Sequence, residues 1–206
     1  RALIGARYLA RRDGILSFAA SLAGAFARVR ADADRPDVQF HFQPLSLDSY
    51  DGQLHPFSGF TMSVCQLRPT SRGSLAIGSP DPRAPPVIHA NYLHTAEDRE
   101  TMIAGVRLLR RIAAAPALAE QVEAEWKPGP GVASDDEVLE YVRATGSSIF
   151  HPSGTCAMGA PGASVVDAEL RVYGLAGLRV ADCSIMPTLV SGNTNAAAIM
   201  IGEKCA

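Results

Sequence analysis

Apolar and polar positions alternate most clearly in the segment "DVQFHFQPLSL" (37–47). One valine and two phenylalanines occupy every second position, and glutamine or histidine stands between them. Successive side chains of a strand point to opposite faces. The pattern therefore predicts a half-buried strand, with His41 on the face opposite the phenylalanines. Two further strands are predicted at 59–67 and 74–79.

Short connections between these segments indicate how the strands pair. Residues 48–58 are predicted to form a loop and residues 68–73 a turn. Short turns can join antiparallel strands, whereas parallel strands need a crossover of a dozen or more residues. We therefore expect an antiparallel sheet. The apolar run at 14–29 stays ambiguous between a buried strand and a helix, because periodicity does not separate the two.

The apolar spacing changes to a helical period later in the chain. The segment 95–115 predicts a helix that begins with Thr95, and Asp98 stands three residues on, as in a capping box. Its apolar face holds Met102, Val106, Leu109 and Ala113. A second helix is predicted over 134–146, with Ser134 and an acidic residue in the same arrangement.

The last quarter of the chain differs from the rest. Two short strands are predicted around 169–173 and 177–181, the second of them buried, and a final helix within 191–206. We divide the chain accordingly into residues 1–150, a sheet with flanking helices, and residues 151–206, a smaller segment. The predicted fold class is α+β.

Composition limits the class of protein. The chain has 206 residues, of which 47% are hydrophobic and 19% charged, as is typical of a soluble globular protein. Its net charge of −2 gives no basic surface for nucleic acid or an anionic membrane. The apolar run at 17–29 is too short to span a bilayer, so we expect no membrane association from this segment.

The histidines and cysteines are scattered along the chain. No pair of the five histidines has the spacing of a zinc site, so we expect no metal. The four cysteines include no C-x-x-C pair, and reduced thiols in a cytoplasmic protein are expected. The chain begins at Arg1 without a methionine and ends inside a predicted helix, so we expect part of a longer polypeptide.

The segment "FHPSGTCAMG" (150–159) carries the clearest candidate chemistry. Pro152 disfavours a helical backbone at His151, and Gly154 permits a turn or a close backbone approach. The imidazole is thus held on stiff backbone at a bend, and loops often carry chemistry. These residues alone are compatible with a packed histidine, with a base, or with a cysteine hydrolase that uses Cys156.

The hydrolase interpretation has two weaknesses in the sequence. Cys156 and His151 are only five residues apart, whereas such pairs usually meet across a fold. No G-x-S-x-G elbow is present either. Nor does any G-x-G-x-x-G follow a predicted strand, so the chain by itself has no dinucleotide-binding unit.

Three ordered blocks resemble one known family. They are "FHPSGTCAMG", "VVDAELRVYGLAGLRVADCSIMP" and "GNTNAAAIMIGEK". Together they resemble the C-terminal portion of the glucose-methanol-choline (GMC) flavin oxidoreductases, and the choline-dehydrogenase-like branch above all. The earlier "PDVQFHFQPL" and "RPTSRGSLAI" resemble that family's substrate domain, so the resemblance covers most of the chain.

The resemblance implies a fold and a cofactor. Residues 1–150 would be the substrate-binding domain, an antiparallel sheet with helices, and residues 151–206 would return to the FAD-binding domain. The family's N-terminal dinucleotide-binding unit is absent from this chain. FAD would thus be held mainly by the N-terminal half of the same polypeptide, which is the expected partner together with a small-molecule alcohol.

The resemblance also implies the catalytic residues. His151 matches the family's active-site histidine, and Asn193 matches its partner. Alcohol oxidation removes a hydroxyl proton and a hydride. An imidazole can accept the proton near neutral pH, and an amide can donate a hydrogen bond to the developing alkoxide.

Five further residues carry weaker assignments from the resemblance. Asp182 and Cys183 would lie beside the ribityl-pyrophosphate part of the flavin, although Asp182 could equally be a helix cap. Thr194 and Asn195 open the last helix, whose first amides could face flavin carbonyl oxygens. Asn195 could instead simply cap that helix. His41 would be a second pocket histidine or an ordinary surface residue of its strand.

The sequence thus predicts a flavin-dependent alcohol oxidoreductase that acts on a choline-like or other primary alcohol. The isolated chain would be inactive and would hold no FAD. The alternative is a non-catalytic substrate-binding module that keeps the fold without the activity.

Overall fold

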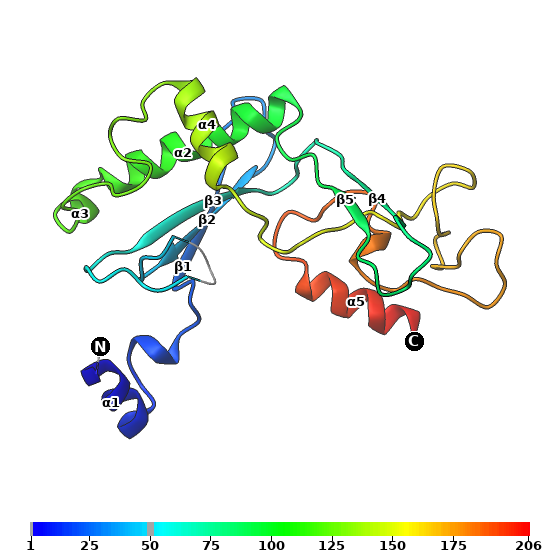
Figure 1. The fold of residues 1–206 in the computed structure, drawn as a ribbon, viewed down its shortest axis with the longest axis horizontal. Coiled ribbons are helices and arrows are strands. Elements are labelled where there is room, and N and C mark those ends of the chain that lie inside the picture. Colours follow the sequence, from blue (N-terminus) through cyan, green and yellow to red (C-terminus); the bar gives the residue numbers. More distant parts are fainter. Residues whose placement is uncertain (1, 49–51) are drawn as a thin grey trace. The chain divides into compact units, whose positions relative to one another are not determined.

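The computed structural model describes residues 2–48 and 52–206 (Figure 1). Residues 49–51, near the start of the predicted loop at 48–58, therefore lie outside the described residues. The chain combines helices with small antiparallel sheets, which confirms the predicted α+β class. It forms two compact units. One comprises the described residues up to Cys65 together with Gly105–Glu123, and the other comprises Gln66–Ala104 and Ala124–Ala206.

The first unit is built around a three-stranded sheet. Its elements are α1 (Ala2–Arg11), the 3-10 helix η1 (Ile15–Ser17), β1 (Ala23–Ala27), β2 (Val38–Gln43), β3 (Thr61–Gln66, which ends at the first residue of the other unit) and α3 (Pro116–Ala119). The strand order is β1-β2-β3, and β1 runs antiparallel to β2 with Ala23 opposite Phe42. The ambiguous run at 14–29 is thus a short 3-10 helix followed by a strand.

The central strand β2 is more deeply buried than its sequence pattern predicts. Val38 and Phe40 are buried as expected, and His41 is half-buried on the opposite face. Gln39 and Gln43 share the face of His41, and both are only 7% exposed. A polar pattern predicts a solvated face, but the two glutamines on this face of β2 are buried as well.

Helix α2 (Ala96–Ala113) is the first of the two predicted long helices. The four apolar residues predicted on its inner face are all half-buried, while its most buried positions are Asp98, Thr101 and Gly105. A Cβ atom added to Gly105 would lie 2.9 Å from Cγ2 of Val64. The helix therefore approaches β3 closely, and glycine makes that approach possible.

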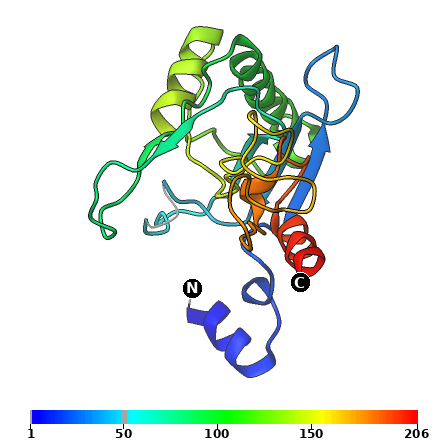
Figure 2. The same cartoon turned by 90° about the vertical axis from the view of Figure 1, so that its right-hand side faces the viewer.

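The second unit contains a two-stranded ribbon and most of the irregular chain. The ribbon consists of β4 (Ser74–Ala76) and β5 (Val87–His89). The unit also contains α4 (Asp135–Thr145), the 3-10 helix η2 (Cys183–Ile185) and α5 (Asn195–Cys205). Strands β4 and β5 pair antiparallel, with Ser74 opposite His89, and Figure 2 shows the loop that joins them. No strand was predicted at β5.

Helix α4 begins as the sequence predicts. The Ser134 hydroxyl accepts a hydrogen bond from the backbone N–H of Glu137 at 3.3 Å. The Glu137 carboxylate accepts one from the backbone N–H of Ser134 at 2.8 Å, which completes a capping box. These hydrogen bonds hold the pKa of Glu137 below its ordinary value. Val138 and Val142 form the buried face of the helix.

The two strands predicted at 169–173 and 177–181 are wrong. The structure has only isolated bridges there, such as Arg171 with Arg179, and no residue from 177 to 179 is buried. Leu170, Gly174 and Gly177 all have positive φ angles, of 66°, 78° and 74°. The two glycines turn the chain between the segments, and the left-handed Leu170 interrupts the first segment, so a longer ladder does not form.

Buried apolar side chains hold this irregular region together. They form what we call the Val166 cluster, which consists of Val166, Leu170, Ile185, Met186 and Ile201. Its members come from the loop segments, from η2 and from α5. Among the described residues, none of the helices has both the length and the apolar content that a bilayer span needs.

Candidate active site

The loop that carries His151 is fastened to η2 by backbone hydrogen bonds. The N–H groups of Gly154, Cys156 and Met158 donate in turn to the carbonyls of Cys183, Ser184 and Ile185, at 3.4, 2.9 and 2.8 Å. The loop therefore runs alongside η2. Ile185 belongs to the Val166 cluster, and Met158 of the loop packs against this cluster. The loop is therefore fixed to the core of this unit.

Glycine allows the bend that the sequence predicts after His151. Gly154 has a φ of 86°, which L side chains rarely adopt. A Cβ atom at this position would lie 3.2 Å from the Met186 carbonyl oxygen. Just before the histidine, Phe150 also has a positive φ, of 61°. The two turns place His151 on a short segment between sharp changes of direction.

Both ring nitrogens of His151 have partners from the entry of α5. Nε2 lies 2.8 Å from Nδ2 of Asn193, and Nδ1 lies 2.9 Å from Oγ1 of Thr194. These residues are 42 and 43 positions away in sequence. His151 is half-buried, Thr194 is buried and Asn193 is exposed. The Val166 cluster brings these residues together in space, because Ile201 of α5 packs with the segments that hold the histidine loop.

The partners determine which ring nitrogen carries the proton. An amide nitrogen is only a donor, so with Nδ2 of Asn193 facing the ring, Nε2 must accept. A neutral imidazole has one donor and one acceptor nitrogen. Nδ1–H then donates to the Thr194 hydroxyl, which can accept. In this arrangement Nε2 carries the lone pair, as a proton acceptor must.

Comparison with known proteins assigns the chain to a family. Residues 69–202 match the model of the GMC oxidoreductase family. The chain belongs to the GMC oxidoreductases. It corresponds to their C-terminal portion, as the three sequence blocks predicted.

Two curated relatives are similar over almost all of this GMC chain. Alcohol dehydrogenase [acceptor] of Pseudomonas putida is 44% identical and matches 100% of the chain. Oxygen-dependent choline dehydrogenase of Serratia proteamaculans (strain 568) is 40% identical and matches 98%. The chain spans only 38% and 37% of these two relatives.

Solved structures share the fold. Pyridoxine 4-oxidase from Mesorbium loti superposes with a TM-score of 0.82 and 31% identity, over 90% of this chain and 37% of its own. A formate oxidase superposes with a TM-score of 0.86 over 100% of this chain and 40% of its own. Its sequence is 24% identical, so this second likeness concerns the fold alone.

Asp182 and Cys183 lie where this GMC chain enters η2. Asp182 is the N-cap of η2 and accepts a hydrogen bond from the backbone N–H of Ser184 at 2.8 Å. Hydrogen bonds from the hydroxyl and the backbone of Ser184 lower the pKa of Asp182. Cys183 packs against the Val166 cluster, and its thiol lies 3.9 Å from the carbonyl oxygen of Thr194. The capping interpretation of Asp182 is confirmed, and the flavin contact of both residues stays a prediction.

Thr194 and Asn195 open α5 as predicted, but neither caps it with a side chain. Thr194 is the N-cap residue, and its side chain makes no capping hydrogen bond. Asn195 is the first helical residue and follows the N-cap position, so the interpretation that Asn195 caps the helix is wrong. The contact between the Thr194 hydroxyl and His151 was not predicted, because the sequence shows only that a threonine stands at a helix entry.

His41 lies in the other compact unit. Its Nδ1 is 3.3 Å from the Ser21 hydroxyl, and its Nε2 is 4.0 Å from the Cys65 thiol. Burial raises the pKa of that thiol, which keeps it protonated. These neighbours agree with the interpretation of His41 as an ordinary residue of a strand. Its role in a substrate pocket stays a prediction.

The cysteine-hydrolase interpretation loses support. Both ring nitrogens of His151 are engaged by Asn193 and Thr194, so neither is directed to the Cys156 thiol. Within the described part of the chain, no three histidine, cysteine or acidic side chains are grouped as metal ligands would be.

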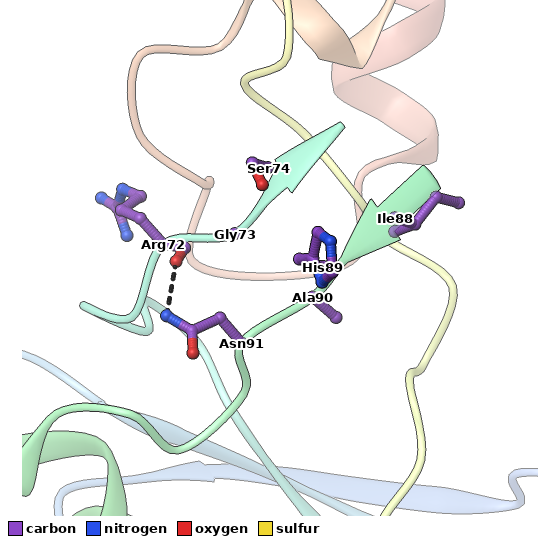
Figure 3. Close-up of a pocket in the computed structure, with 7 residues that line it drawn as sticks. All are labelled: Arg72, Gly73, Ser74, Ile88, His89, Ala90 and Asn91. Atoms are coloured by element: carbon purple, nitrogen blue, oxygen red, sulfur yellow. Dashed lines mark hydrogen bonds between the residues drawn. The ribbon is translucent and has the colours of Figure 1, made fainter. Parts of the chain in front are cut away.

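A hollow on the β4–β5 ribbon contains none of the predicted site residues. It has a volume of about 470 Å³, and its lining residues are Arg72, Gly73, Ser74, Ile88, His89, Ala90 and Asn91 (Figure 3). The Asn91 amide donates to the Arg72 carbonyl across it at 2.9 Å. The Arg72 guanidinium donates to carbonyls of its own turn, at Pro69 and Ser71. We therefore place the candidate active site at His151 and not at this hollow.

Proposed function

We propose that the polypeptide containing this chain is a flavin-dependent oxidoreductase of a primary alcohol, choline-like or other, with His151 as its base. The contact between Nε2 of His151 and Nδ2 of Asn193 carries the proposal, since it pairs a proton acceptor with a hydrogen-bond donor. The names of two relatives, an alcohol dehydrogenase and a choline dehydrogenase, support the substrate class.

In the proposed reaction, the substrate hydroxyl takes the place of the direct contact between Asn193 and His151. The hydroxyl donates to Nε2, and the Asn193 amide donates to the substrate oxygen. As the proton moves to Nε2, negative charge develops on that oxygen, and a preorganised donor stabilises it. His151 then carries protons on both nitrogens, and its Nδ1–H stays bonded to Thr194.

FAD is the cofactor that the family implies, and the first turn of α5 fits it. No side chain caps this helix at Thr194. The first backbone N–H groups of a helix have no carbonyl partner within it and lie at its positive end. These groups suit the carbonyl oxygens of a flavin ring. When bound, FAD supplies the acceptor for the hydride that leaves the carbinol carbon.

We further propose that FAD is held mainly by the N-terminal half of the same polypeptide. The chain lacks the glycine-rich strand-to-helix turn that would receive the pyrophosphate. Asp182 and Cys183 would lie near the ribityl-pyrophosphate region, and His41 near the substrate. By itself the chain would bind no FAD and show no activity. The cytoplasmic location stays a prediction from cysteine usage.

Anaerobic titration of the full-length protein tests the proposed function. Its flavin absorption should bleach on addition of a primary alcohol, choline among those tried. A tertiary alcohol is the matched control, because it has a hydroxyl but no hydrogen on the carbinol carbon. Binding of primary alcohols without bleaching would instead support the alternative, a substrate-binding module without activity.

A further inference from the structure

We propose that Thr194 is a positioning residue, whose hydroxyl, together with the Asn193 amide that donates to Nε2, holds His151 in the tautomer with the proton on Nδ1. Its catalytic consequence rests on the proposed function, whereas the tautomer itself does not. The Thr194 hydroxyl lies 2.9 Å from Nδ1 of His151, while Thr194 is only 6% exposed. A buried hydroxyl needs a hydrogen-bond partner, and the imidazole is the partner here.

The position of Thr194 excludes its most common alternative role. Threonine at a helix N-cap usually accepts a hydrogen bond from a backbone N–H of the first turn. The Thr194 side chain makes no such bond. The helix therefore has no side-chain cap at Thr194, and the Thr194 hydroxyl contacts the His151 ring instead.

The tautomer decides whether Nε2 can act as a base. With Thr194 accepting from Nδ1–H, Nε2 keeps its lone pair toward the Asn193 amide. Without the hydroxyl, Nδ1–H would be left without this acceptor, which is costly for a partly buried group. The imidazole can then move its proton to Nε2, where a reversed Asn193 amide would accept it through its oxygen. That tautomer has no lone pair on Nε2 for the substrate proton.

Two substitutions separate the hydroxyl from the shape of the side chain. Thr194→Val keeps the branched shape and removes the acceptor. Thr194→Ser keeps the acceptor and removes a methyl group. The backbone carbonyl of Thr194, which accepts from Ala198 at 2.8 Å, is unchanged in both variants. A purely structural role would tolerate Val better than Ser, and a positioning role requires the opposite order.

The experiment is ¹⁵N NMR of the full-length, FAD-loaded protein with labelled histidine side chains. Loss of signals in a His151→Gln variant assigns the His151 ring. We expect the Nδ1–H tautomer in the wild type and in Thr194→Ser, and the Nε2–H tautomer or a mixture in Thr194→Val. Flavin reduction should slow by about 10- to 100-fold in Thr194→Val alone, by analogy with the hydrogen-bond partners that orient metal-ligating histidines.

The outcomes distinguish this proposal from the proposed function. An Nε2–H tautomer in the wild type, or an unchanged tautomer in Thr194→Val, would overturn the role of Thr194 whatever the activity. If Thr194→Val does not fold, Thr194→Ala provides the same comparison. The wild-type spectrum by itself still shows whether His151 carries its proton on Nδ1, as the proposal requires. The expected tautomers in a protein that no alcohol reduces would uphold the role of Thr194 and overturn the proposed function.

Discussion

The Nε2 atom of His151 lies 2.8 Å from the Nδ2 atom of Asn193, although 42 residues separate the two along the chain. Neither local backbone produces this contact alone. The histidine loop is fastened to η2, η2 and α5 share the Val166 cluster, and Asn193 stands just before α5. A proton acceptor and a hydrogen-bond donor are thereby held together by the packing of a small apolar core.

Replacement of Asn193 tests the donor in this pair. Asn193→Ala should slow flavin reduction in the full-length protein by about 10²–10³-fold, by analogy with the loss of one oxyanion-hole donor. The substitution removes the hydrogen bond of an exposed side chain to His151, so the variant should still fold. Stopped-flow reduction and thermal unfolding test these two expectations. A reduction rate within a factor of two of the wild type would remove Asn193 from the reaction.

Cys156 should be dispensable. Its backbone N–H holds the loop to Ser184, while the ring nitrogens of His151 are engaged elsewhere. Cys156→Ser should therefore retain most of the rate of flavin reduction. Thiol alkylation of the wild type provides an independent check. If both the substitution and the alkylation abolished activity, the results would support Cys156 as a catalytic residue and contradict this prediction.

Asp98 should stabilise the second unit in a pH-dependent way. It is 1% exposed and accepts backbone hydrogen bonds from Thr70 at 2.8 Å and Ser71 at 2.9 Å. Burial raises its pKa, but these hydrogen bonds, with others from the side chains of Ser71 and Thr70, outweigh burial and lower it below its ordinary 3.8. Asp98→Ala should reduce the free energy of unfolding at pH 7 by about 2–4 kcal/mol.

The pH dependence of this effect has a definite sign. A carboxylate with a lowered folded-state pKa contributes stability that is present above its unfolded pKa and is lost as the pH falls through the folded value. The difference between wild type and Asp98→Ala in urea unfolding should thus shrink below about pH 3.8. Exposed Glu123, which lies outside the helices, is the control, and Glu123→Ala should be near neutral at both pH values. A gap that widens in acid would contradict the account of Asp98.

Gly105 should resist replacement although it is helical. Alanine normally favours a helix over glycine by about 1 kcal/mol. At Gly105, however, the added Cβ would lie 2.9 Å from Cγ2 of Val64, and such overpacking costs about 1–3 kcal/mol. We expect Gly105→Ala to lower the free energy of urea unfolding, and Val64→Ala to restore part of it in the double variant.

Gly5 is the matched control for this prediction. It also lies within a helix, α1, but an added Cβ would meet nothing within 4 Å. Gly5→Ala should leave stability unchanged or raise it. Equal effects at the two glycines would show that helix propensity, and not the approach to Val64, governs position 105.

Features set by local sequence were predictable, and those set by packing were not. The start of α4 was predicted from Ser134 because a capping box needs only four consecutive residues. The strands at 169–173 and 177–181 were wrong, since Leu170, inside the first of them, has a left-handed backbone that the apolar pattern does not show. His151 and Asn193 were assigned from family resemblance, and the Thr194 hydroxyl contact depends on how α5 packs.

Stopped-flow flavin reduction of the full-length protein with His151→Ala tests the central claim most directly. Loss of a general base typically costs about 10²–10⁴-fold, so the rate should fall by that factor while FAD stays bound. The wild-type rate should rise with pH, because only the unprotonated imidazole accepts a proton, and the variant should lose this dependence. A His151→Ala protein that is reduced at the wild-type rate, with an unchanged pH profile, would contradict the assignment of His151 as the base.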